Sequence, residues 1–372
     1  MEKSNHVLTY NTEPYYFTIS FPIISIERLK MLNSFKISLK QLDAQLNEIV
    51  NFIDSINSSV ISRSTVSYNA VIISLYGCYE NYVNSLIGEL IRQISDSSSD
   101  YNEIPTDMII RNLNLSSDFL NAPQRYKNFD LQNEDVINNI YSGRITNKLL
   151  LKHGGNLSIT VLSDYMKNLG IKNVAQSIKN SDDYHKYYSE KNMISVENAK
   201  TYLNELDNNT VFTSLDDIIS QRNAIAHSWK SDEKVDYLII KDEWIKFIKI
   251  FCKCLYNIVI QFYSEWLVKH NKLFCPLKFQ IYGSSIVGFF DVIPHWNGNK
   301  ETILIKSNDK IHVGKIMNVK IFESHKASME IEGCSLQKEK TDNYSFYFDK
   351  AFLEGCTDNV EQLEERPATL NN

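Results

Sequence analysis

The sequence is poor in the residues that interrupt helices. Its 372 residues include only 12 glycines and 7 prolines, which favours long helices over a chain built on frequent turns. The 6 cysteines are scattered and none forms a C-x-x-C pair, so we expect reduced thiols in a cytoplasmic protein. Cys252 and Cys254 lie two positions apart on an expected helix and face different directions, which argues against a metal site there.

The sequence also lacks an uninterrupted apolar run long enough for a membrane span. Its most apolar stretch is WIKFIKIFCKCLYNIVIQFYSEWLV (residues 244–268), which three lysines interrupt at helical spacing, namely Lys246, Lys249 and Lys253. We expect a helix with a wide apolar face and one solvated stripe. The net charge of −6 argues against a protein that coats nucleic acid electrostatically, although a small site that handles RNA remains compatible with it.

The N-terminal two thirds of the chain have helical periodicity. Apolar residues at steps of three and four predict a long helix over residues 26–60 and a second one over residues 67–94. Residues 100–142 are rich in Asn and Asp and predict loops and short helices. Further helices are expected to end at Gly154–Gly155, to end at Gly170, and to cover residues 236–270.

After Pro276 the pattern changes to short runs with β-branched residues, separated by Gly, Asn and Asp. These runs predict five or six strands and a small β-sandwich or barrel. His295, His312 and His325 have no matching partners in this part and are expected at its surface. The predicted organisation is an irregular segment (1–25), a helical domain (26–272), a small β-sandwich or barrel domain (275–356) and a disordered tail (357–372).

The stretch SLDDIISQRNAIAHSW (residues 214–229) carries the clearest candidate site. Arg222 is followed directly by Asn223, and His227 comes five residues after the arginine within one predicted helix. A step of five turns a helix by about 140° and rises about 7.5 Å, so Arg222 and His227 cannot form one tight site on a single rigid face. A two-fold copy of the helix would bring two such pairs together in one cleft.

Three segments together resemble the HEPN superfamily, in particular the larger subgroup found beside restriction and other defence genes. They are RNAIAHSW (222–229), SLYGCYENYVNSLI (74–87) and GNLSITVLSDYMKNLGI (155–171). The resemblance covers residues 26–270 and implies a mainly α fold, an antiparallel helical bundle that dimerises, here followed by a small all-β C-terminal domain. Many members of the superfamily are metal-independent endoribonucleases whose Arg-x4-6-His motif acts from both subunits.

The resemblance assigns roles to particular residues. Arg222 and His227 correspond to the catalytic pair, Asn223 to the polar position that follows the arginine, and Glu80 to an acidic position on the earlier helix. Glu80 lies among tyrosines, so it equally fits a hydrogen-bond partner that holds Arg222. One subgroup has a tyrosine, two places after the histidine, that a partner antitoxin nucleotidylates; this chain has Trp229 there and departs from that pattern.

These residue types fit RNA cleavage by the 2′-OH group. Histidine can transfer protons near pH 7, and arginine offers permanent charge to phosphate oxygens, so no metal or cofactor is expected. One reading is a homodimeric ribonuclease that cuts tRNA or mRNA, a toxin or antiviral defence effector with an antitoxin or defence-system partner and no membrane association. The alternative is a non-catalytic HEPN scaffold or a ligand- or RNA-binding module whose β domain binds a partner. In that case Arg222, Asn223 and His227 would only join helices or cap an interface.

Overall fold

The structure is a computed structural model that describes residues 28–58, 64–228 and 234–270 and the backbone of six strands between residues 278 and 347. The predicted irregular segment 1–25 and the predicted tail 357–372 lie outside the described residues, as do Trp229, His295 and His325.

The described chain is helical up to residue 270. The longer helices are α1 (Arg28–Ser58), α2 (Thr65–Ser97), α3 (Thr106–Asn121), α4 (Asn133–Tyr141), α6 (Ile159–Lys167), α8 (Asp182–Asn192), α9 (Val196–Glu205), α11 (Thr213–Ser228) and α13 (Ile245–Lys269). The shorter ones are η1 (Tyr101–Glu103), η2 (Pro123–Phe129), α5 (Asn147–Leu150), α7 (Val174–Lys179), α10 (Asn208–Val211), α12 (Tyr237–Ile239) and the π-helical turn η3 (Ile240–Trp244).

Helices α1 and α2 form where the apolar periodicity predicts them. On α1 the buried side chains recur at steps of three and four, and they include Leu42, Leu46 and Ile49. Helix α2 begins after Ser64, whose side chain accepts a hydrogen bond from the backbone N–H of Ser67 and so satisfies one free donor of the first turn. The predicted long helix near the end of this part is also present, since α12, η3 and α13 follow one another without a break.

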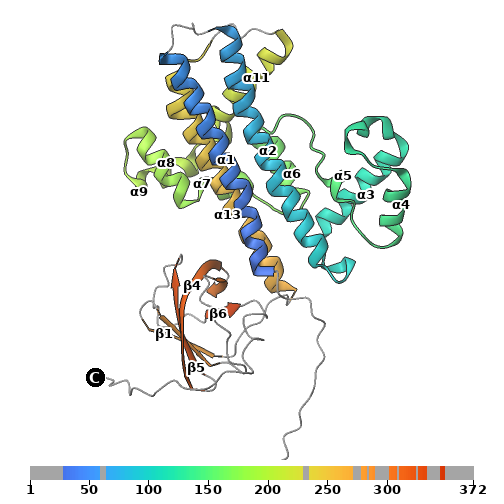
Figure 1. The fold of residues 1–372 in the computed structure, drawn as a ribbon, viewed down its shortest axis with the longest axis vertical. Helices are drawn as coiled ribbons and strands as arrows, with labels where there is room; N and C mark the ends of the chain where they lie inside the picture. The colour runs from blue at the N-terminus through green and yellow to red at the C-terminus, as the bar shows by residue number, and fades with distance from the viewer. Residues whose placement is uncertain are drawn as a thin grey trace, which may run out of the picture.

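The long helices α1, α2 and α13 lie side by side and form the centre of the molecule (Figure 1). The pairs Lys241–Asp54 and Lys249–Asn47 show that the segment η3–α13 runs antiparallel to α1. The core between them contains stacked and edge-on aromatic rings, such as Phe251 against Tyr79 at a centroid distance of 6.0 Å. Each large side chain buried in this way contributes about 1.5–3 kcal/mol to folding.

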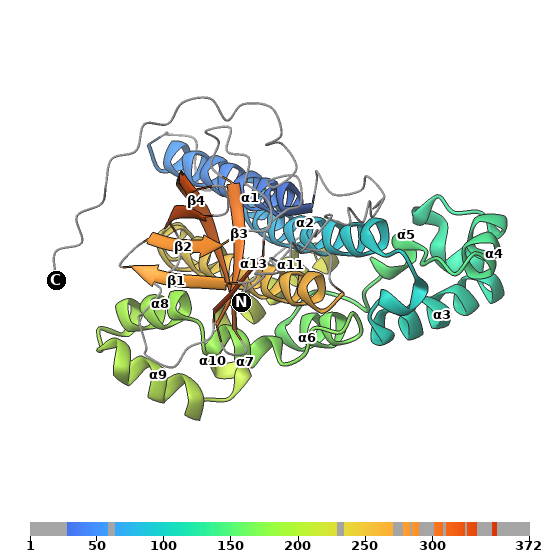
Figure 2. The ribbon, with the colours of Figure 1, turned by 90° about the horizontal axis from the view of Figure 1, so that it is seen from below.

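Two groups of shorter helices flank this centre on opposite sides, α3–α5 on one and α7–α9 on the other (Figure 2). The prediction of short helices and loops for residues 100–142 is confirmed by η1, η2 and α4, whereas α3 is longer than predicted, one helix of 16 residues. Two of its four buried side chains are the polar Asn112 and Ser116. The buried face of α3 therefore does not show the apolar spacing that would predict one long helix. The helix predicted to run to Gly154 is split into α4 and α5, with Gly143 at a φ of 62° in the break.

The lysines of α13 form the solvated stripe that their spacing predicts. Lys249 bonds to Asn47 of α1, and Lys253 bonds to Asp183 of α8 at 2.7 Å. None of the helices in the described part of the chain combines the length and the apolar character that a membrane span requires.

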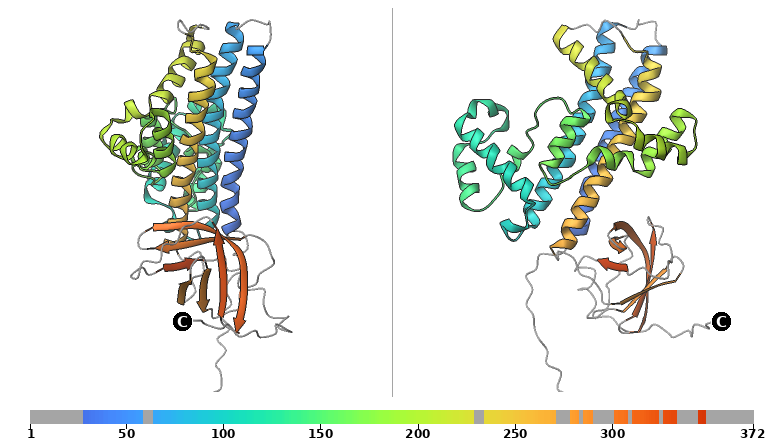
Figure 3. Two further views of the ribbon diagram at one scale, coloured as in Figure 1. Left: turned by 90° about the vertical axis from the view of Figure 1, so that its left-hand side faces the viewer. Right: turned by 180° about the vertical axis from the view of Figure 1, so that it is seen from behind.

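The strands lie beyond the end of α13, each at one of the runs predicted to be extended (Figure 3). They are β1 (Lys278–Tyr282), β2 (Ser285–Phe289), β3 (Glu301–Ser307), β4 (Lys310–Glu323), β5 (Lys326–Glu332) and β6 (Tyr344–Tyr347). They form one antiparallel sheet in the order β1-β2-β5-β4-β3-β6, with irregular register at two points between β4 and β5. That this part folds as a separate sandwich or barrel domain stays a prediction.

Candidate active site

Helix α11 carries three of the four predicted site residues. Its apolar residues Leu215, Ile218 and Ile225 are buried against the core, as the sequence pattern indicates. Arg222 and Asn223 are half-buried on the side of the helix that meets α2, whereas His227 is exposed near the end of the helix. The structure therefore separates the two members of the predicted catalytic pair.

Arg222 lies over an aromatic ring of α2. The centre of its guanidinium is 5.3 Å from the ring centroid of Tyr76, and its Nη1 donates a hydrogen bond of 3.3 Å to the side-chain oxygen of Asn223. In the described part of the chain, Arg222 forms no ion pair with a carboxylate. Its positive charge is therefore not neutralised by an acidic side chain in direct contact with it.

Asn223 joins α11 to the loop between α5 and α6. The side-chain amide of Asn156 donates a hydrogen bond of 2.8 Å to the side-chain oxygen of Asn223. We call this segment, residues 152–158, the His153 loop. The same oxygen of Asn223 accepts from Arg222, so this one side chain links the arginine to the loop.

Two tyrosines of α2 fix the next residue of the His153 loop, Leu157. The backbone N–H of Leu157 donates to the hydroxyl of Tyr76 at 3.1 Å, and the hydroxyl of Tyr79 donates to the carbonyl of Leu157 at 2.8 Å. Both polar backbone groups of this buried residue are satisfied by side chains one helical turn apart. The loop is consequently held against α2 without regular secondary structure of its own.

Glu80 contacts the same tyrosine that supports Arg222. The hydroxyl of Tyr76 donates a hydrogen bond of 3.2 Å to Oε1 of Glu80. Burial raises the pKa of Tyr76 to about 12, the N–H of Leu157 opposes this shift, and the negative charge of Glu80 adds to it. The expectation that Glu80 holds Arg222 was wrong: among the described contacts, Tyr76 and His153 are the partners of Glu80, because the ring of Tyr76 occupies the place beside the guanidinium.

The structure adds His153, which the sequence motif did not indicate. Its Nε2 lies 3.9 Å from Oε1 of Glu80, and its Nδ1 lies 2.7 Å from the carbonyl oxygen of Gly155. Its ring also packs against that of Tyr165 of α6, with centroids 5.9 Å apart. The only sequence signal was a polar segment, KHGGN, at the end of a predicted helix, and such a segment is also typical of an ordinary surface loop.

These contacts form a closed network of side chains around Tyr76 of α2. Arg222 contacts Tyr76, Tyr76 contacts Glu80, and Glu80 faces His153. The His153 loop then returns to Arg222 through Asn156 and Asn223. A guanidinium, an imidazole and a carboxylate, the groups that bind anions and transfer protons, are thus gathered within one chain.

His227 lies outside this network of side chains around Tyr76. It makes no hydrogen bond or ion pair with any residue that the structure describes, and its side chain is exposed. A step of five along a helix gives this separation directly, because it rotates the side chain by about 140° away from Arg222.

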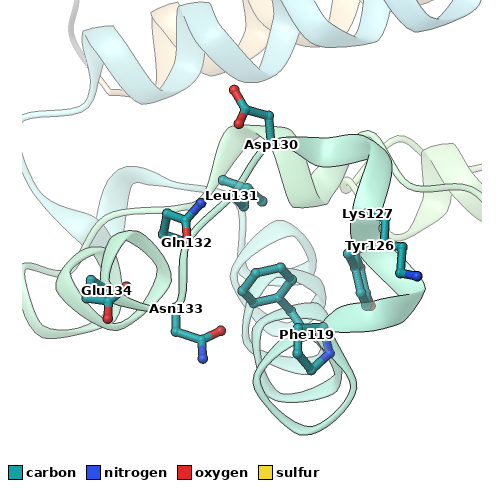
Figure 4. Close-up of a pocket in the computed structure, with 9 residues that line it drawn as sticks. Phe119, Tyr126, Lys127, Asp130, Leu131, Gln132, Asn133 and Glu134 are labelled. Atoms are coloured by element: carbon teal, nitrogen blue, oxygen red, sulfur yellow. The ribbon is translucent and has the colours of Figure 1, made fainter.

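A hollow of about 460 Å³ between η2 and α4 is a less suitable place for such chemistry (Figure 4). The rings of Phe119 and Tyr126 lie on one side of it, and Gln132, Asn133 and Glu134 lie on the other. Its lining holds no histidine or arginine, so it lacks the groups that RNA cleavage without a metal requires. In the described residues, no group of three or more His, Cys, Asp or Glu side chains could hold a metal ion.

The chain was compared with known families and with known proteins. The sequence model of the family described as RiboL-PSP-HEPN matches residues 40–261, which is more than half of the chain. The match begins on α1, ends on α13 and includes every residue of the network of side chains around Tyr76. A search of curated proteins found no match, and a search of solved structures found none either.

Proposed function

Because the chain belongs to the RiboL-PSP-HEPN family, we propose that it is a metal-independent endoribonuclease whose site combines Arg222, Asn223 and His227. The observation that carries the proposal is the environment of Arg222. This guanidinium is half-buried, lies over Tyr76 and has no carboxylate partner in the described part of the chain. A fixed positive charge of this kind suits a phosphate group of RNA.

The proposed reaction is attack of a 2′-oxygen on the adjacent phosphorus. His227 accepts the proton of the 2′-hydroxyl, since imidazole is the side chain suited to proton transfer near neutral pH. Arg222 donates to the phosphate oxygens and stabilises the additional negative charge of the phosphorane. Asn223 keeps Arg222 in place through its hydrogen bond. The products carry a 2′,3′-cyclic phosphate and a 5′-hydroxyl.

We propose a homodimer, because His227 and Arg222 of one chain face different directions. Support comes from the end of the bundle that carries His227. Tyr68 of α2 bonds to Gln221 of α11 and to the backbone of Val235, so the start of α2 and the segment before α12 lie at this same end. Large apolar side chains are exposed there, among them Val66 and Leu238. Exposed apolar residues near the motif suit a subunit interface.

The biological role that we propose is that of a toxin or antiviral defence effector acting on tRNA or mRNA in the cytoplasm, under control of an antitoxin or defence-system partner. The strands after residue 278 would form a separate β domain that selects RNA or senses the trigger. Family membership and the predicted reduced thiols support this role.

Cleavage of RNA by the purified protein tests the proposal. Arg222→Ala and His227→Ala should each abolish cleavage while the variants remain folded. Arg92→Ala and His270→Ala are matched controls, since Arg92 is exposed and pairs with Glu89 and Asp96, and the ring of His270 packs at a tilt against Trp266 at the end of α13. Full cleavage by His227→Ala would rule out the proposed site. If the wild-type protein cleaves no RNA, the non-catalytic scaffold becomes the better reading.

A further inference from the structure

We propose that His153 is the general acid of the reaction and protonates the leaving 5′-oxygen from the same subunit that supplies Arg222. This inference rests on the proposed ribonuclease function and adds a residue to it. It does not come from the sequence motif, because His153 lies 69 positions before Arg222 in the chain, on the loop between α5 and α6.

The tautomer of His153 follows from its neighbours. Nδ1 lies 2.7 Å from the carbonyl oxygen of Gly155, and a carbonyl oxygen can only accept, so Nδ1 carries a proton and donates it. A backbone carbonyl at one ring nitrogen fixes the orientation of the ring and leaves the second nitrogen, Nε2, to exchange protons. This is the arrangement that a catalytic histidine requires.

The Nε2 atom makes no strong hydrogen bond within the described residues, so it can donate a proton to a substrate. Its distance of 3.9 Å from Oε1 of Glu80 is longer than the roughly 2.7–3.2 Å of an N–H···O bond. When Nε2 is protonated, its charge faces the carboxylate of Glu80. An oxygen of the substrate that approaches closer than Glu80 can therefore accept this proton.

The ring of His153 is held by a neighbouring aromatic ring as well as at Nδ1. Tyr165 packs against it, and the guanidinium of Arg111 lies 5.0 Å from the centroid of Tyr165. Arg111 also donates a hydrogen bond to the carbonyl of Lys152, the residue before His153. A histidine of an ordinary surface loop would not be fixed from so many directions, and this order suits a residue that must meet a reacting atom.

Two glycines without side chains, Gly154 and Gly155, leave space through which a substrate can reach the ring of His153. An added Cβ at Gly154 or Gly155 would meet no atom within 4 Å, so the chain is open on that side. Gly155 has a φ of 152°, which favours glycine, so the turn that brings its carbonyl to His153 depends on this residue. The side chain of His153 keeps 16% of its surface exposed, which is sufficient for contact with one atom of a bound strand.

The step balances without a further reactant. The 2′-oxygen forms a bond to phosphorus and loses its proton to His227. The bond between phosphorus and the 5′-oxygen breaks, its electron pair stays on that oxygen, and the proton on Nε2 of His153 joins it. Afterwards His227 is protonated and His153 is neutral, and exchange with water restores both.

A substrate with sulfur in place of the scissile 5′-oxygen tests this role, because a leaving thiolate needs no proton. On ordinary RNA, His153→Asn should cleave about 100-fold to 10,000-fold more slowly than the wild type, the usual contribution of a general acid. On the sulfur substrate the difference should fall below about tenfold. His227→Ala should stay slow on both substrates, since its proposed role is that of the base. His270→Asn should match the wild type on both.

The outcomes separate the two proposals. If the wild type cleaves RNA and His153→Asn is as fast, or is equally slow on both substrates, His153 is not the general acid while the ribonuclease function stands. If the wild type cleaves neither substrate, the ribonuclease function fails and this inference fails with it. Binding of a 2′-deoxy RNA analogue by His153→Asn, measured beside its thermal unfolding, shows whether the variant keeps the native site, so a slow but unfolded variant is recognised.

Discussion

Asn156 donates its side-chain amide to the side-chain oxygen of Asn223, across 67 positions of the chain and over a distance of 2.8 Å. This hydrogen bond connects the Arg-containing helix directly to the His153 loop. It gives Asn223 a structural explanation: its oxygen accepts from Asn156 and from Arg222 together, so a residue at this position must offer a hydrogen-bond acceptor.

The first prediction concerns the charge at Asn223. Asn223→Asp would place a carboxylate beside Arg222, which would form an ion pair and compete with the substrate phosphate. The rate of RNA cleavage should fall by at least about tenfold. Complete removal of one donor that stabilises a transition state lowers the rate by about 100-fold to 1,000-fold, and here the donor is only diverted. Asn223→Ser keeps an uncharged oxygen and should lose less. Rates of cleavage under single-turnover conditions compare the two variants, and a fully active Asn223→Asp would show that Arg222 does not bind phosphate.

The second prediction concerns sharing of the site between subunits. Leu238 is exposed at the end of the bundle that carries His227, and Leu238→Asp should weaken the dimer and reduce cleavage together. Sedimentation velocity measures the first effect. Ile110→Asp is the matched control, because Ile110 is similarly exposed but lies on α3, away from that end. A monomeric Leu238→Asp protein with full activity would contradict the shared site.

Mixing of two inactive variants provides a third prediction. A heterodimer of Arg222→Ala and His227→Ala subunits keeps one arginine and one histidine on different chains. If these two residues meet across the two-fold axis, part of the cleavage activity should return. Each variant alone serves as the control. Recovery in a mixture that sediments as separate monomers would contradict the dimer.

The fourth prediction concerns metal independence. Cleavage should persist in EDTA, because the proposed proton transfer and charge stabilisation use histidine and arginine side chains. Sequencing and end-labelling of the products should find 2′,3′-cyclic phosphate or 3′-phosphate ends. A strict requirement for Mg²⁺, or products with 3′-hydroxyl ends, would exclude the mechanism.

The fifth prediction concerns stability in alkali. Burial raises the pKa values of Tyr76, Tyr187 and Tyr256 to about 12, above the value of about 10 for an exposed tyrosine. The folded protein therefore holds these protons more tightly than the unfolded chain. The free energy of unfolding is unaffected by them below about pH 10 and should fall as the pH rises from there to about 12.

Urea denaturation at a series of pH values measures that slope. Tyr76→Phe should lose less stability between pH 10 and 12 than the wild type, whatever its stability at neutral pH. Tyr141→Phe, at a residue with 88% of its surface exposed, should keep the wild-type slope. A slope in Tyr76→Phe equal to that of the wild type would contradict a raised pKa for Tyr76 in the folded protein.

Much of the helical fold could be predicted because apolar periodicity is a local property. Helices α1, α2 and α13 bury stripes of Leu, Ile and aromatic residues at helical spacing, and these stripes are visible in the sequence. The extent of helix α3 was not predicted within the expected short helices, since Asn112 and Ser116 occupy part of its buried face. The Asn112 side chain accepts a hydrogen bond from the backbone of Thr146, a partner that no local pattern could indicate.

The site was predictable only where its residues share one helix. Arg222, Asn223 and His227 were found from their spacing in the sequence and from the family resemblance. His153 was missed because its importance depends on where an irregular loop is anchored, by Asn223 through Asn156 and by Tyr76 and Tyr79 through Leu157. Glu80 was assigned to the site, but its partner was not, because the ring of Tyr76 takes the place beside Arg222.

The double attachment of Leu157 also makes its amide proton a natural reporter. The N–H group is buried and bonded to Tyr76, so its exchange with solvent deuterium requires the His153 loop to detach from α2. Exchange at this one amide measures how often the loop opens. A strand of RNA that orders the loop would slow this exchange, and the effect would be visible even when no bond in the RNA is cut.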